Sequence, residues 1–306
     1  CIYEPHSAAT GFVINKSITD NASIHKGSTF VFNIDLKDFF HSFHRSWVKY
    51  GFMIAPFNLG GEREKIAFLI ASLCTNPVKL NGFTENVLPQ GSPTSPTITN
   101  ILSAKLDRRL LGLAKRFGAR YSRYADDITF SSEINIFKKA KNPVLNEKGS
   151  YEDFISELER IIKEFDLKLN PSKTRLQYKA NKQEVTGLIV NEKVNVKKRY
   201  IKQIRMWLYY WEKYGYAKAE QVFRQDYKRE KGHVKNGTPN LLNVLDGKLE
   251  FLKMVKGIDD STYLLLKMRF DRLSGAISPF NEVLDIWEKD GINEAINYVK
   301  ENNFKL

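Results

Sequence analysis

The sequence has 306 residues, of which 42% are hydrophobic, and this length suits one large folded domain or two to three smaller ones. Lys and Arg number 48 against 35 Asp and Glu, and the resulting net charge of +13 favours a polyphosphate partner such as nucleic acid. The two cysteines exclude a disulfide scaffold and a cysteine-rich zinc module, and no segment approaches the roughly 18 uninterrupted apolar residues of a transmembrane helix. We therefore expect a cytoplasmic protein that is not embedded in a membrane.

The first predicted elements are a buried strand and two helices. Residues 30–36 form an apolar run that ends in an acid, as expected of a strand. The apolar spacing in residues 62–75 and 97–116 predicts helices with broad hydrophobic faces. Between them, residues 89–96 are rich in Pro, Ser and Gly and predict a loop.

Further along the chain, an acidic pair lies between two apolar segments. Residues 121–131 predict a β-hairpin with Asp126 and Asp127 between its strands. Residues 136–151 are polar and predict an exposed insertion, whereas residues 152–165 predict an amphipathic helix. Residues 184–196 predict a second hairpin that turns at Asn191.

From Lys197 onward the chain becomes basic, aromatic and helical, which predicts a domain boundary. Aromatic side chains interleaved with cations are typical of a helix that contacts nucleic acid, and the cations here are Lys197, Lys198, Arg199, Lys202 and Arg205. Trp207 and Trp211 lie four residues apart, so they equally predict a core stripe. We expect one packed face and one basic face, and residues 223–235 add a further basic patch.

Three carboxylates form the central chemical signal. Adjacent carboxylates such as Asp126 and Asp127 repel each other, so they occur together mainly where a cation neutralises them. Asp35, at the end of an apolar strand, would complete a site for Mg²⁺, which prefers oxygen ligands. The alternative is a solvated Asp-Asp turn, but the apolar strands on both sides of the pair argue against it.

The order of five motifs resembles that of bacterial reverse transcriptases. In chain order these motifs are Asn33–Phe40, Leu88–Pro96, Tyr121–Asp127, Leu169–Thr174 and Val185–Leu188. Within that family, Asn21-Ala22-Ser23-Ile24-His25 and Val185-Thr186-Gly187 resemble elements of retron reverse transcriptases. His25 is also compatible with an ordinary helix-capping or core histidine.

The resemblance implies a role for each candidate residue. Asp35 and Asp126 would bridge two Mg²⁺ ions, which activate the primer hydroxyl and neutralise the leaving pyrophosphate, and Asp127 would complete the acidic cluster. Phe40 would pack under the nucleotide sugar and exclude a 2′-hydroxyl. The alternative is that Phe39 and Phe40 are both core residues, and of the two we favour Phe39 for the core. Nucleotide binding would further involve Gln90, Gly91 and Lys173, although Lys173 also suits a solvated lysine. RNA contact would involve Asn21 and His25 in addition to the cations that follow residue 196.

The implied architecture is α+β, the right-hand polymerase fold with fingers, an antiparallel palm sheet and a helical thumb. We expect residues 1–29 to be a remnant of the fingers, 30–197 the palm with a fingers segment at about 45–87, and 198–306 the thumb. The basic residues of the N-terminal fingers that grip the triphosphate are expected to be missing, because the chain starts in mid-pattern at Cys1.

The implied function is RNA-directed DNA synthesis from dNTPs on a cognate structured noncoding RNA. The product would be single-stranded DNA linked to RNA, made for antiphage defence, with an effector or toxin protein as a possible partner. The alternatives are another bacterial defence or group-II-intron-like reverse transcriptase and, from a different class, a catalytically inactive RNA-binding scaffold. The intact set of Asp35, Asp126 and Asp127 argues against the scaffold.

Overall fold

The computed structural model describes residues 3–80, 82–231, 237, 239–275 and 279–301. The chain divides into two compact units, Cys1–Val194 and Asn195–Leu306. Within the described residues, no helix has both the length and the apolar character needed to cross a membrane.

A four-stranded antiparallel sheet is the centre of the first unit. Its order is β4-β5-β1-β6, formed by β1 (Phe30–Asp35), β4 (Arg120–Tyr124), β5 (Asp127–Ser132) and β6 (Arg175–Tyr178). Both the predicted strand at 30–36 and the predicted hairpin at 121–131 are present. β1 lies between two strands and has buried residues on both faces, which explains the apolar residues on both sides of Asn33.

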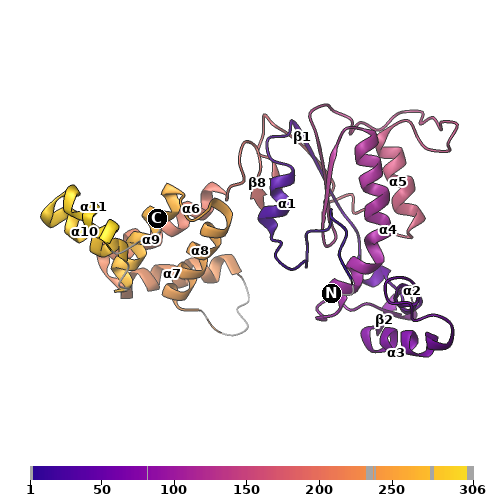
Figure 1. Ribbon diagram of the computed structural model, residues 1–306, viewed down its shortest axis with the longest axis horizontal. Coiled ribbons are helices and arrows are strands. Elements are labelled where there is room, and N and C mark those ends of the chain that lie inside the picture. Colours follow the sequence, from indigo (N-terminus) through magenta and orange to yellow (C-terminus); the bar gives the residue numbers. More distant parts are fainter. Residues whose placement is uncertain (1–2, 81, 232–236, 238, 276–278, 302–306) are drawn as a thin grey trace. The chain divides into compact units, whose positions relative to one another are not determined.

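Two helices cover one face of this sheet, α4 (Ser95–Arg116) and α5 (Phe154–Glu164) (Figure 1). Leu106 and Leu110 of α4 are buried in one core with Phe130 of β5 and with Phe154 and Leu158 of α5. The predicted helices at 97–116 and 152–165 therefore exist, with ends shifted by no more than two residues. Between β5 and α5, residues 141–149 of the predicted insertion are exposed.

The N-terminal segment also packs on the sheet. α1 (Ile18–Ile24) contacts β4, and Ser17 caps it in a reciprocal capping box with Asp20. Ahead of this helix, Ala9 forms a parallel bridge with Arg123 of β4 and is 1% exposed. The segment predicted to be a remnant of the fingers is thus built into the sheet layer.

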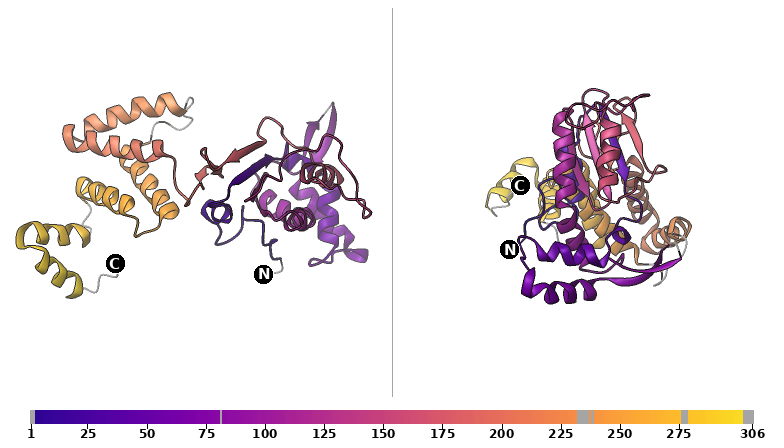
Figure 2. Two further views of the ribbon diagram at one scale, coloured as in Figure 1. Left: turned by 90° about the horizontal axis from the view of Figure 1, so that it is seen from above. Right: turned by 90° about the vertical axis from the view of Figure 1, so that its right-hand side faces the viewer.

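The segment predicted as fingers lies at one end of the first unit (Figure 2). Its elements are α2 (Arg45–Met53), η2 (Gly61–Arg63), α3 (Glu64–Cys74), β2 (Asn76–Leu80) and β3 (Phe83–Val87), and η1 (Phe40–Ser42) precedes them. In α3 only Ala67 and Ala71 are buried, so much of the apolar face predicted for residues 62–75 is exposed.

The second hairpin differs from its prediction, because its turn lies at Thr186-Gly187 and not at Asn191. β7 (Glu184–Val185) pairs with β8 (Leu188–Ile189), and both turn residues have positive φ, the geometry that two-residue hairpins favour. The Asn191 side chain instead donates to the carbonyls of Lys179 and Asn181.

The second unit is helical in its described residues. It contains α6 (Lys198–Tyr214), α7 (Tyr216–Lys231), α8 (Leu241–Lys256), α9 (Ser261–Ser274), α10 (Pro279–Asp290) and α11 (Ile292–Glu301). Trp207 of α6 meets Phe223 of α7 edge to face, with ring centroids 5.1 Å apart. Part of the basic patch predicted at 223–235, residues 232–235, lies outside the described residues.

Candidate active site

The register of the sheet brings the predicted carboxylates to one end of the hairpin. Asp35, the last residue of β1, is the cross-strand partner of Asp127, the first residue of β5. Asp126 lies in the turn between β4 and β5, and its carbonyl accepts a hydrogen bond from the Leu36 amide at 3.2 Å. The β1 end and the turn are thereby tied together by backbone contacts.

The electrostatics of the site reflect this proximity. Burial, followed by the charges of Asp126 and Asp35, raises the pKa of Asp127 to about 6. Burial also raises the pKa of Asp126, with a smaller contribution from Asp35. The three carboxylates therefore repel one another in a partly desolvated place, and a cation would relieve that repulsion.

Asp35 already has two polar partners. The Lys173 ammonium lies 3.0 Å from Asp35 Oδ1, and Asn170 Nδ2 donates to Asp35 Oδ2 at 3.0 Å. The hydrogen bond to Asp35, followed by the Asp35 charge, raises the pKa of Lys173. The Lys173 ammonium therefore lies at the acidic cluster, and its side chain is also exposed to solvent.

The carboxylates of the site fit a magnesium ion that also keeps water or phosphate ligands. In the part of the chain that the structure describes, no group of three or more His, Cys, Asp and Glu side chains is arranged to hold a metal ion. Mg²⁺ usually binds one or two carboxylates together with water and substrate phosphates, and is not enclosed in an all-protein cage. Asp35 and Asp127 match that pattern because they line one cavity from paired strands.

This cavity has a volume of about 350 Å³ and carries both acids and bases. Its walls are formed by Asn33, Ile34, Asp35, Asp127, Ser172, Lys173, Arg175, Thr186 and Gly187. Arg175 is the lining residue that lies outside all of the motifs named in the sequence analysis. Arg175 could have been predicted from the sequence, because it is a cation that follows Lys173 by two residues, and it lies at the start of β6. A mixed lining of this kind suits a ligand with phosphates and a bound cation.

Of the residues predicted to contact the nucleotide, Lys173 lines that cavity, whereas Phe40, Gln90 and Gly91 lie outside its lining. Phe39 is 2% exposed in the core, whereas Phe40 is half-buried and meets it edge to face with centroids 5.7 Å apart. Gln90 and Gly91 are exposed between β3 and α4, and Gly91 has a φ of 94° that favours glycine.

Asn21 and His25 are buried, and the prediction that they contact RNA is wrong for this structure. His25 is 0% exposed, and its two ring nitrogens hydrogen-bond Ser131 and Ser122, each at 2.8 Å. Burial lowers the pKa of His25 to about 3, so the ring is neutral. Asn21 is 1% exposed and accepts a hydrogen bond from Thr10 at 2.8 Å. Both side chains connect α1 and its flanks to neighbouring parts of the unit.

In the second unit, α6 separates its side chains into two faces. Ile204, Trp207, Leu208 and Trp211 are buried. The exposed cations Lys198, Lys202 and Arg205 follow one another at spacings of four and three residues, so they share one helix face, called here the cationic face. Lys197 and Arg199 are exposed as well.

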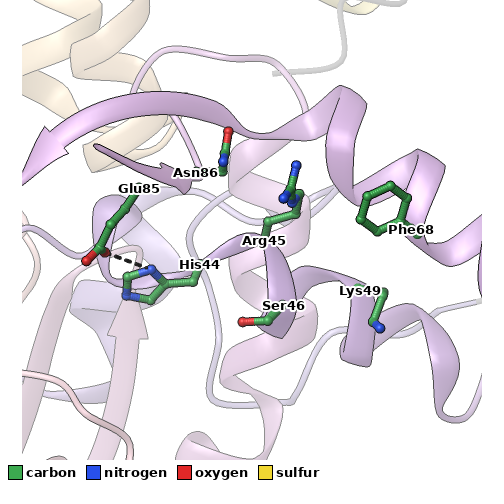
Figure 3. A pocket seen from close by; sticks show the side chains of 7 residues that line it. All are labelled: His44, Arg45, Ser46, Lys49, Phe68, Glu85 and Asn86. Carbon is green, nitrogen blue, oxygen red and sulfur yellow. Dashed lines mark ion pairs between the residues drawn. The ribbon is translucent and has the colours of Figure 1, made fainter. Parts of the chain in front are cut away.

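A second cavity of about 350 Å³ is lined by residues between His44 and Asn86, close to the bounds of the segment predicted as fingers (Figure 3). His44 contacts Glu85 at 3.0 Å, Lys49 pairs with Glu64 at 2.7 Å, and Arg45 lies 5.2 Å from the centroid of the Phe68 ring. None of the predicted site residues lines this cavity.

Comparison with known proteins decides the family. The profile described as "Reverse transcriptase (RNA-dependent DNA polymerase)" matches residues 3–190, more than half of the chain. The chain belongs to the reverse transcriptase family. The match covers the sheet and all three carboxylates, and it confirms the expected palm architecture of the α+β polymerase fold.

The curated relatives are retron reverse transcriptases, in agreement with the predicted resemblance. The chain is 40% identical over 198 residues to the retron Mx162 reverse transcriptase of Myxococcus xanthus, covering 61% of this chain and 39% of the relative. It is 32% identical to the Mx65 enzyme of the same organism, covering 81% and 51%, and 34% identical to the Ec86 enzyme of Escherichia coli, covering 64% and 53%. The chain thus spans about half the length of these relatives or less.

Proposed function

We propose that this chain synthesises DNA on an RNA template, adding deoxynucleotides to a primer. The observation that carries the proposal is the register that sets Asp35 opposite Asp127, with Asp126 in the adjoining turn. Phosphoryl transfer depends on positioning and charge neutralisation more than on covalent chemistry, and this cluster provides for both. An inactive RNA-binding scaffold would have no need for the complete acidic set.

In this proposal Asp35 and Asp126 would hold two Mg²⁺ ions, and Asp127, which lines the cavity together with Asp35, would complete the cluster. Bound Mg²⁺ would supply charge neutralisation to the attacking hydroxyl and to the leaving pyrophosphate. Lys173 offsets part of the negative charge of Asp35. Because its side chain is exposed, its ammonium could also bind the phosphate of an incoming nucleotide. Phe40 would face the sugar of the nucleotide, and Gln90 and Gly91 would approach the base and template.

We further propose that the RNA is a cognate structured noncoding RNA, as in a retron. The similarity to retron reverse transcriptases supports this, and the cationic face of α6 offers phosphate contacts, which dominate recognition of folded RNA. Residues 30–197 would be the palm, with fingers at about 45–87, and 198–306 the thumb. The product would be RNA-linked DNA in a cytoplasmic antiphage system with an effector protein.

Primer extension with labelled dTTP on an RNA template tests the proposal. The full chain should extend the primer, and Asp126→Asn should lower the rate by at least about a hundredfold while RNA affinity is kept, because an amide does not neutralise a cation. The matched control is Asp259→Asn at an exposed position of the second unit, which should extend normally. RNA binding without extension by the wild-type chain would instead favour the inactive scaffold.

Nucleic acid that co-purifies from the native host separates the retron from its alternatives. One short DNA still joined to one enriched RNA supports the retron proposal. Heterogeneous DNA copied from arbitrary transcripts would favour another defence-type or group-II-intron-like enzyme.

A further inference from the structure

A fully buried ion pair lies directly behind the turn that carries Asp126. The Arg123 guanidinium binds the Asp107 carboxylate through two hydrogen bonds of 2.7 Å, and both side chains are 0% exposed. Tyr121 donates a further hydrogen bond of 2.7 Å to Asp107. Such a two-pronged contact fixes the plane of the guanidinium as well as its position.

The remaining donors of Arg123 reach the turn and its neighbour. Arg123 Nη1 donates to the Ala125 carbonyl at 3.0 Å, and Nη2 donates to Asn100 Oδ1 at 3.1 Å. Ala125 has a φ of 56°, a left-handed conformation that costs a non-glycine residue free energy. A contact that holds the Ala125 carbonyl therefore stabilises a backbone shape that the residue would not choose alone.

Gly11, in the N-terminal segment, packs closely against the same turn. A Cβ atom at Gly11 would lie 2.6 Å from the Ala125 amide nitrogen, which is closer than real Cβ atoms come, and 3.1 Å from Tyr124 backbone atoms. Gly11 has no positive φ, so the close approach to the turn explains why the position suits glycine. Its carbonyl accepts from Asn100 Nδ2 at 2.9 Å, which links Gly11 back to Arg123.

We infer that Gly11, Asn100, Asp107 and Arg123 are positioning residues that set the Asp126 turn for catalysis, here called the turn clamp. This inference rests on the proposed function. Within the core the charge of Arg123 is matched by that of Asp107, so the clamp acts on the carboxylates through the backbone of Ala125. Displacing a catalytic group by about an ångström costs roughly a hundredfold in rate, so a small shift of this turn has a large effect.

The test compares Gly11→Ala with Gly112→Ala, which adds the same methyl group at an exposed helical position with open space around it. Four quantities are measured on the full chain: kcat and KM for dTTP, the affinity for RNA, the thermal midpoint, and the affinity for Mn²⁺ alone by electron paramagnetic resonance. Gly11→Ala should lower kcat by about ten- to a hundredfold and weaken Mn²⁺ binding, with KM and RNA affinity nearly unchanged. Gly112→Ala should match the wild-type chain.

Asn100→Ala provides a second route if Gly11→Ala fails to fold. It removes the links to Gly11 and Arg123 without leaving a buried charge unpaired. It should lower kcat by about three- to tenfold, with KM for dTTP nearly unchanged. A folded Gly11→Ala or Asn100→Ala variant with wild-type kcat and Mn²⁺ affinity would overturn the clamp. If the wild-type chain makes no DNA, the proposed function fails, and the Mn²⁺ affinities of the variants still decide the inference.

Discussion

In the first unit, Asp35 and Asp127 meet only because β1 and β5 pair in one register, whereas in the second unit Lys198, Lys202 and Arg205 share a face because of their spacing along α6. The carboxylate end of the sheet is supported by buried polar side chains, and the cationic face is an exposed surface on an apolar helix core. The two regions should therefore respond differently to mutation. Substitutions of the buried polar residues that support the sheet should change the stability of the fold. Substitutions on the cationic face of α6 should change only the electrostatic part of RNA affinity.

The largest effect is expected at His25, on the structural side of the comparison. Burial lowers the pKa of His25 from 6.5 to about 3 in the folded chain. The contribution of the neutral ring to the free energy of unfolding is therefore fully present above pH 6.5 and is lost as the pH falls toward 3. Between pH 7 and 5 this group alone should cost about 2 kcal/mol, roughly a thirtyfold change in the folding equilibrium. Hydrogen exchange of the β4 and β5 amides should show that His25→Gln removes this pH dependence.

The control for this prediction is His41→Gln, at a partly exposed position. It should keep the pH dependence of the wild-type chain. Equal pH dependence in the wild-type and His25→Gln chains would show that the buried ring does not connect proton uptake to unfolding.

The next effect tests the cationic face. Reversing Lys198, Lys202 and Arg205 to Glu should reduce the slope of log RNA affinity against log salt by about 2, because each lost phosphate contact removes roughly 0.7 of slope. Between about 50 and 200 mM salt this amounts to a difference of roughly sixteenfold. Anisotropy of a labelled stem-loop RNA measures it.

The same charge change elsewhere provides the control. Lys138, Lys141 and Lys148 are exposed in the insertion, and reversing them to Glu should leave the slope close to that of the wild-type chain. If both triple variants flatten the slope equally, binding follows net charge and the cationic face has no particular role.

Phe40 is the intermediate case, half-buried in a region that faces the core on one side. Phe40→Ala should raise incorporation of ribonucleotides relative to deoxynucleotides by about tenfold, because a smaller side chain admits the 2′-hydroxyl. Competition assays with labelled rUTP and dTTP measure the ratio. Phe83→Ala, at a side chain 73% exposed, is the control, and an unchanged ratio in folded Phe40→Ala would make Phe40 a core residue only.

Sequence patterns predicted the elements that local signals determine. The helices at 95–116 and 154–164 follow apolar periodicity, and the Tyr124–Asp127 turn follows from two apolar strands around an acidic pair. The turn of the second hairpin differs from the prediction because residue type alone favours Asn191, whereas Thr186 and Gly187 adopt the positive φ values that a tight hairpin needs.

The errors at the site concern interactions between distant parts of the chain. Asn21 and His25 were assigned to RNA because a short motif does not reveal burial, and the partners of His25 lie 97 and 106 residues away. The pairing of Arg123 with Asp107 and the approach of Gly11 to Ala125 gave no periodic signal, since they depend on the tertiary fold. A joint site of the three carboxylates was predictable from the acidic pair and from the acid at a strand end, whereas the pairing of Asp35 with Asp127 depends on the register of β1 and β5.

The most direct test of the account is whether Asp35, Asp126 and Asp127 form one metal site in solution. Fe²⁺ substituted for Mg²⁺ in the presence of ascorbate and peroxide generates radicals that cut the chain next to the bound ion. The account predicts cuts grouped around Asp35, around Asp126–Asp127 and near Lys173, all suppressed by excess Mg²⁺ and by Asp126→Asn. Cuts distributed along the chain, or grouped elsewhere and unaffected by Asp126→Asn, would contradict it.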